Sequence, residues 1–189
     1  MKKVLSVIIV CCFAISCFAQ EHLSFKGIPI TGSMTEFCKK LSQKGFTKLG
    51  SDNNATIFRG DFTGRNSTVL VGATEDGKSV YTVVVIFDAS GEWNVLTNTY
   101  DYYKEIYTRK YGNTSFCQEK NPAHSDSNVA LMAEVHQGTV VWASQWKPTG
   151  GTIELSIEKA DGVYEGMVVI RYRDDQNVEA KIQRDIDDI

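Results

Sequence analysis

The sequence predicts an α+β fold in which helices cover one face of an antiparallel sheet. Three observations predict it. An amphipathic stretch with helical spacing occurs in each half of the chain, short β-branched runs follow it, and Asp-Gly turns lie at Asp76-Gly77 and Asp161-Gly162. Because Asp-Gly is typical of tight hairpins, the strands on either side of these turns should be antiparallel.

The first half begins with a short extended segment at 22–30, followed by a helix. Ser33 and Glu36 match the capping box, in which a serine oxygen and a glutamate carboxylate each satisfy a free backbone N–H. An apolar stripe with helical spacing follows and ends before Gly45, a usual residue after a helix. We expect four strands next, at 46–49, 56–62, 68–74 and 80–87.

The second half repeats this order. Its helical stripe consists of Trp93, Leu96, Tyr100, Tyr103 and Tyr107, and Gly112 ends it. The polar segment 113–128 is predicted to be a loop. Strands are expected at 130–136, 140–146, 152–158 and 167–173, and the polar tail from Gln176 has apolar residues at helical spacing.

The apolar positions of the two halves correspond strand by strand, about 84 residues apart. The matching segments are 58–62 with 142–146, 69–73 with 153–157, and 83–87 with 168–172. A repeat longer than a solenoid unit predicts two tandem helix-plus-four-strand modules. The expected organisation is a first module at 20–90, a second at 91–175 and a polar C-terminal tail at 176–189.

Residues 1–19 have the three parts of a secretory signal peptide: a basic start, an apolar core at 4–18 and a small residue, Ala19. The apolar core is shorter than the roughly 20 residues of a bilayer-spanning helix. We therefore expect cleavage after Ala19, with Gln20 or Glu21 as the first mature residue. The mature protein would be periplasmic or secreted.

A lipid anchor is the alternative. Ala14-Ile15-Ser16-Cys17 resembles the site at which bacterial lipoproteins are cut and lipidated on cysteine. Processing there would make the chain an outer-membrane lipoprotein anchored through Cys17.

The charge balance is mildly acidic. The chain has 20 basic and 23 acidic residues and a net charge of −3, and loss of Lys2 and Lys3 with the signal would leave about −5. Nucleic acid binding needs clustered basic side chains, so a nucleic acid partner is not expected. The size after cleavage is sufficient for one well-buried domain or two small halves that share a core.

Two of the five cysteines, Cys38 and Cys117, lie outside the predicted signal. In an oxidising compartment they can pair, which predicts a possible disulfide. The alternative is that Cys38 is a small apolar residue on a helix face. Pairing requires Cα atoms within roughly 7 Å of one another, a condition that spacing along the chain does not decide.

This organisation resembles a known fold. A tandem helix-plus-four-strand module behind a signal peptide is similar to the β-lactamase-inhibitor-protein-like and PepSY-like folds. The chain also resembles small exported proteins of Gram-negative gut bacteria at the signal end Phe18-Ala19-Gln20, the opening Phe25-Lys26-Gly27-Ile28-Pro29 and the helix end Lys110-Tyr111-Gly112. The resemblance implies an exported α+β protein, and it brings no known active residues.

The residues that usually carry catalysis or bind metals form no motif. His22, His124 and His136 lack metal-ligand spacing, and His124 with Asp126 is better explained as a solvated loop pair. The sequence has no Gly-x-Ser-x-Gly elbow, and Cys38 lies within a predicted helix where burial would keep a thiol protonated. We predict a protein that is not an enzyme and has neither metal nor other cofactor.

The candidate binding residues are Phe58, Phe62, Trp142 and Trp146, which even spacing places on one face of the sheet. One interpretation is that they form the core beneath the helices. The alternative is that they line the face that the helices leave uncovered, where Trp would form a binding surface. The inhibitor fold binds its partner through a concave sheet, which favours this alternative by resemblance.

Two function classes follow. The first is a non-catalytic module that binds or inhibits a protein or peptide outside the cytoplasm, and an exposed aromatic patch would favour it. The second is a protein that binds a small ligand or an envelope component. An apolar pocket of roughly 300 Å³ or more would favour the second class.

Overall fold

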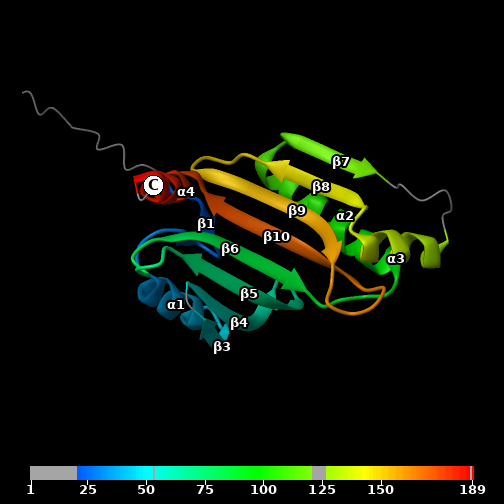
Figure 1. The fold of residues 1–189 in the computed structure, drawn as a ribbon, viewed down its shortest axis with the longest axis horizontal. Helices are drawn as coiled ribbons and strands as arrows, with labels where there is room; N and C mark the ends of the chain where they lie inside the picture. Colours follow the sequence, from blue (N-terminus) through cyan, green and yellow to red (C-terminus); the bar gives the residue numbers. More distant parts are fainter. Residues whose placement is uncertain (1–20, 53, 121–126, 188) are drawn as a thin grey trace, which may run out of the picture.

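The computed structural model describes residues 21–52, 54–120, 127–187 and 189, and its main element is an eight-stranded antiparallel sheet (Figure 1). The helices are α1 (Met34–Gln43), α2 (Trp93–Tyr111), α3 (Asn128–Gln137) and α4 (Asp175–Asp187). The strands are β1 (Ser24–Phe25), β2 (Ile28–Pro29), β3 (Thr47–Asp52), β4 (Ala55–Phe62), β5 (Arg65–Ala73), β6 (Val80–Phe87), β7 (Phe116–Lys120), β8 (Val141–Trp146), β9 (Gly151–Lys159) and β10 (Gly166–Asp174).

The strand order of the large sheet is β3-β4-β5-β6-β10-β9-β8-β7, with every neighbouring pair antiparallel. The last strands of the two chain halves, β6 and β10, lie side by side at the centre, where Val85 pairs with Ile170. Strands β3 and β7 form the two edges. The hairpin β1–β2 forms a separate two-stranded sheet.

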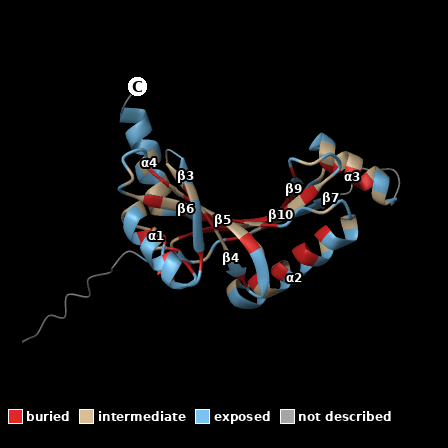
Figure 2. Ribbon diagram, turned by 90° about the horizontal axis from the view of Figure 1, so that it is seen from below, coloured by how far each residue is buried: buried red, intermediate tan, exposed pale blue. Residues whose placement is uncertain are grey.

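Helices α1 and α2 pack on the same side of the large sheet. Helix α1 lies against β5 and the β1–β2 hairpin, whereas α2 lies against β8, β9 and β10. Figure 2 shows both helices below the sheet, which bends so that its ends rise away from them. The predicted α+β class, with helices against an antiparallel sheet, is therefore confirmed.

The core lies between the sheet and these helices. Side chains alternate across a strand, so every second residue of each strand faces α1 and α2. One cross-strand row on this side consists of Phe58, Val69, Val85, Ile170, Leu155 and Ser144, all fully buried. A single cluster of buried apolar side chains extends beneath both chain halves.

Local signals in the sequence place α1 and the β5–β6 hairpin as predicted. Ser33 Oγ accepts a hydrogen bond from the Glu36 N–H at 3.3 Å and caps α1. In the hairpin, Gly77 has a φ of +65°, which favours glycine. Hydrogen bonds from Thr74 and the Lys78 N–H lower the pKa of the neighbouring Asp76 carboxyl to about 2.

The predicted strand at 130–136 is wrong, because these residues belong to helix α3. Ser127 Oγ accepts from the Ala130 N–H at 3.3 Å, and Gly138, with a φ of +72°, ends the helix in the left-handed conformation. Leu131 and Val135, one helical turn apart, are both buried against the core.

The predicted loop at 113–128 is also corrected in part. Residues 116–120 form the edge strand β7, which pairs with β8. All five side chains of β7 are exposed, so the polar composition that suggested a loop belongs to a strand at the sheet edge. The tail with helical spacing forms α4.

The predicted signal peptide and the alternative lipidation site at Cys17 lie outside the described residues. Within 21–52, 54–120, 127–187 and 189, no helix combines the length and the apolar composition needed to span a bilayer.

Candidate functional site

The four predicted binding residues lie on the helix side of the sheet. Phe58 and Trp146 are 0% exposed and Phe62 is 5% exposed. Trp142 is half-buried and meets the ring of Trp93 edge-on, with the ring centroids 5.1 Å apart. The core interpretation is correct, and the alternative that placed these side chains on the uncovered face is wrong, because α1 and α2 cover the face that carries them.

The predicted disulfide is also wrong, since Cys38 and Cys117 are both free. Cys38 lies on α1, which packs beneath β5, whereas Cys117 lies on β7, five strands further along the sheet. Five strand spacings amount to about 24 Å, far beyond the reach of a disulfide.

The histidines occupy separate places. His22 Nδ1 contacts Asp174 Oδ2 at 3.0 Å, and the His136 ring packs against Tyr164 with centroids 5.2 Å apart. His124 lies outside the described residues. Among the residues that the structure describes, no three His, Cys, Asp or Glu side chains are grouped as metal ligands.

The uncovered face of the sheet carries the most unusual surface. Strands with one face in water usually alternate apolar and polar residues, but β6 is apolar on both faces. Val84 and Ile86 point away from the helices, and Val84 pairs with Leu70, which pairs with Ile57. All four of these aliphatic side chains are half-buried. We call Ile57, Leu70, Val84 and Ile86 the open-face patch.

An ion-pair network borders the open-face patch on β9 and β10. Arg171 is the cross-strand partner of Val84, and its Nη2 atom donates to Glu158 Oε2 at 2.7 Å. Arg171 also lies 3.5 Å from Glu154, whose other carboxylate oxygen lies 3.6 Å from Arg173. Burial alone would raise the pKa of Glu158, but hydrogen bonds from Arg171 and Ser156 outweigh it and lower that pKa.

The uncovered face is concave. In Figure 2 the middle of the sheet lies low and the segments near α3 and α4 stand higher at its two ends. A concave surface on which an apolar patch lies beside a cluster of charged side chains has the composition of a binding site for another macromolecule. The residues of this surface were missed by the sequence analysis, although the unbroken apolar run of β6, Val83–Phe87, is a signal of a two-sided strand.

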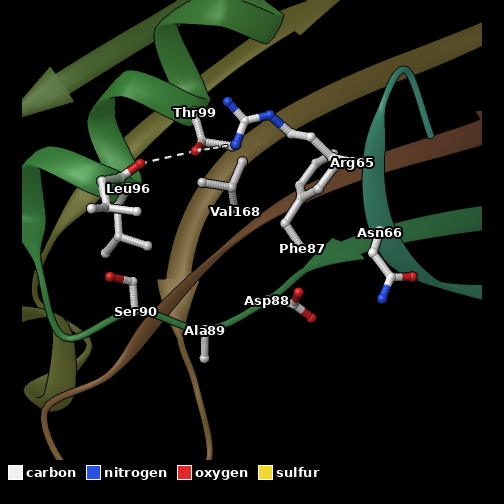
Figure 3. Close-up of a pocket in the computed structure, with 10 residues that line it drawn as sticks. Arg65, Asn66, Phe87, Asp88, Ala89, Ser90, Leu96, Thr99 and Val168 are labelled. Carbon is white, nitrogen blue, oxygen red and sulfur yellow. Dashed lines mark hydrogen bonds between the residues drawn. The ribbon is translucent and has the colours of Figure 1, made fainter. Parts of the chain in front are cut away.

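A cavity of about 360 Å³ lies on the helix side, between α2 and the β4–β5 turn (Figure 3). Arg65 points into it, donates to Thr99 Oγ1 at 3.4 Å and lies over the ring of Tyr102. Asp88, on the opposite wall, pairs with Arg59 at 2.6 Å. Because both charged groups already have partners, we assign no ligand to this cavity.

None of the protein-family models, curated proteins or solved structures with which the chain was compared matches it. The resemblance to β-lactamase-inhibitor-protein-like and PepSY-like proteins therefore stays a prediction.

Proposed function

We propose that this chain is a non-catalytic binding module that holds a protein or peptide partner on the concave, uncovered face of its sheet. The observation that carries the proposal is the open-face patch. Water-exposed sheet faces normally present polar side chains, and an apolar group of four neighbouring residues indicates a surface that is covered in the functional state.

The border of the patch suggests how a partner is selected. Arg171, Glu154 and Glu158 are already paired with one another, so a partner meets fixed charges of both signs. Such charges contribute more to orientation and specificity than to affinity. Because the chain as a whole carries a net charge of −3, a neutral or basic partner would associate fastest.

We further propose that the two chain halves are tandem modules. Each half consists of a helix followed by four strands in meander order, and the halves meet at β6 and β10. This arrangement supports the proposal because two similar units joined at their last strands produce one wide sheet with one uncovered face. The insertion of α3 between β7 and β8 distinguishes the second half.

The partner is expected outside the cytoplasm, since the chain begins with the features of a signal peptide. We propose release into the periplasm or the medium, with a lipid anchor at Cys17 as the alternative. In either case the partner belongs to the cell envelope or to the surroundings of the cell.

The test is a capture experiment with matched variants. The mature protein and the double variant Ile57→Arg/Val84→Arg are immobilised and exposed to envelope extract of the parent cell, and bound proteins are identified by mass spectrometry. Both substitutions lie on the uncovered face, so the core beneath the helices stays intact. We expect a partner that binds the natural protein. Its affinity for the double variant should be lower by about 30-fold or more.

The control is Val163→Arg, which adds the same side chain at a turn position that is already 72% exposed. It should capture the same partner as the natural protein. Thermal melts of all three proteins verify folding. Equal capture by the natural protein and the folded double variant would refute the proposed binding face.

A further inference from the structure

A second concave site lies on the opposite side of the sheet from the open-face patch. It is a groove of about 720 Å³ between the β1–β2 hairpin, the end of α2 and the turn that joins β8 to β9. This volume falls within the roughly 300–1,000 Å³ of small-ligand pockets. The groove therefore has the dimensions to hold a small molecule rather than a polypeptide.

The floor of the groove is aromatic. Its rings belong to Phe62, Tyr107, Tyr111 and Tyr172. Tyr107 and Tyr111 are stacked, with ring centroids 5.9 Å apart and planes inclined by 17°. Tyr107 and Tyr172 each keep about 5% of their surface exposed, so both remain accessible at the floor of the groove. Such a floor favours a flat, apolar molecule.

The wall of the groove is cationic. Lys26 lies over the ring of Phe62, with its Nζ atom 5.6 Å from the centroid, and Lys110 lies 4.9 Å over the ring of Tyr111. Both lysines are exposed, and neither has a carboxylate partner within the part of the chain that the structure describes. These ammonium groups are consequently available to an anion.

No acidic residue of the described chain lines the groove. Asp174, the carboxylate that contacts His22, is fully buried and accepts hydrogen bonds from the Leu23 and Asn177 N–H groups. The lining is thus positive in a chain whose net charge is −3. Because the lining is positive, the ligand is expected to be negatively charged.

We propose that this groove binds a small amphipathic anion, with a flat apolar body on the aromatic floor and a sulfonate, sulfate or carboxylate group between Lys26 and Lys110. The site is separate from the proposed partner-binding face, and either can exist without the other.

Two tyrosines of the floor are held together through their hydroxyl groups. The Tyr107 and Tyr172 hydroxyls are hydrogen-bonded to one another, a contact that uses one of their two hydrogens. Burial raises the pKa of both tyrosines, so both hydroxyls stay protonated at neutral pH.

The test uses two fluorescent probes that differ in charge. Anilinonaphthalene sulfonate carries a sulfonate, whereas N-phenyl-1-naphthylamine has the same ring system without it. Each probe is titrated into the natural protein, the double variant Lys26→Gln/Lys110→Gln and the control Lys39→Gln/Lys40→Gln, which removes two exposed lysines of α1.

We expect the natural protein and the control to bind the sulfonate at least about tenfold more tightly than the neutral probe. The double variant should lose about tenfold or more in affinity for the sulfonate and keep its affinity for the neutral probe, since only the charge contact is removed. The preference for the sulfonate should also decrease as salt is added.

Two further variants locate the probe. Ile57→Arg/Val84→Arg changes the opposite face and should leave sulfonate binding unchanged, whereas Tyr111→Ala removes part of the floor and should weaken both probes. The inference is overturned if the Lys26/Lys110 variant binds the sulfonate as well as its control does. It is equally overturned if the open-face variant abolishes binding while the groove variants retain it.

Discussion

The Nδ1 atom of His22 lies 3.0 Å from the Oδ2 atom of Asp174, which ties the start of the described chain to the last residue of β10. Asp174 is 0% exposed, and the same oxygen accepts from the Leu23 N–H at 3.0 Å. Its other oxygen accepts from the Asn177 N–H at 3.0 Å, the position of an N-cap for α4. One carboxylate thus holds the N-terminal segment, the central sheet and the C-terminal helix together.

Replacement of Asp174 by alanine should destabilise the protein strongly. It leaves the buried Leu23 N–H without its acceptor and removes the cap of α4, at a combined cost of about 2–4 kcal/mol. The thermal midpoint should fall by roughly 5–15 °C. Asp185→Ala is the control, because that carboxylate on the same helix is exposed, and its midpoint should change little. Equal midpoints for the two variants would contradict the role assigned to Asp174.

Trp146→Ala should behave as a core truncation. The side chain is 0% exposed and lies against Tyr107, so its removal should cost about 3–5 kcal/mol and lower the midpoint by more than about 10 °C. Trp146→Phe keeps most of the ring and removes an indole N–H that has no partner in the described chain, so it should cost less. A midpoint shift below about 3 °C for Trp146→Ala would show that the residue is not core.

Gly60→Ala should destabilise the first half of the sheet. An added Cβ would lie 2.5 Å from Cδ1 of Phe46, whose ring is itself buried, and such overpacking costs about 1–3 kcal/mol. Gly50→Ala on the edge strand β3 is the matched control, since its added Cβ meets no atom within 4 Å. Urea denaturation of both variants distinguishes them, and equal unfolding midpoints would argue against the Phe46 contact.

The contact between Arg171 and Glu158 predicts a pH-dependent contribution to stability. The pKa of Glu158 is lowered below its ordinary value of 4.5, so the contribution is present above that pH and is lost as the pH falls through the folded-state pKa. The free energy of unfolding of the natural protein should therefore exceed that of Glu158→Gln at pH 7, and the difference should shrink at pH 3.

Urea denaturation at the two pH values measures this difference. Glu179→Gln on α4 is the control, because its exposed side chain should give a small difference at both pH values. The prediction would be refuted if the difference in free energy of unfolding between the natural protein and Glu158→Gln were the same at pH 7 and pH 3.

The processing of the N-terminus is tested by mass spectrometry of the protein from its native host. We expect a chain that starts at Gln20 or Glu21, because the apolar core and the small residue Ala19 precede that point. A diacylated Cys17 would instead establish the lipid anchor, and a retained Met1 would exclude both kinds of processing.

Short-range signals account for the elements that were predicted correctly. The Ser33 cap and the Asp76-Gly77 turn depend on atoms a few residues apart, so their outcome is encoded locally. Helix α3 has the same kind of cap signal at its two ends. The strand prediction followed its apolar run instead, because that run has no clear period and is equally typical of a strand. Ser127 and Gly138 at its ends were the informative residues.

The sequence by itself determined the α+β class, the hairpins and which residues share a face, because alternation along a strand depends only on the backbone. Only the tertiary structure decided which face the helices cover. That choice depends on where α1 and α2 pack, through contacts between residues far apart in the chain. It buried Phe58 and Trp146 and left Val84 half-buried on the uncovered face. The separation of Cys38 from Cys117 was likewise decided by the tertiary structure, since distances across an eight-stranded sheet are fixed by strand order rather than by spacing in sequence. Lys26 and Lys110 meet at one groove because the β1–β2 hairpin packs beside the end of α2.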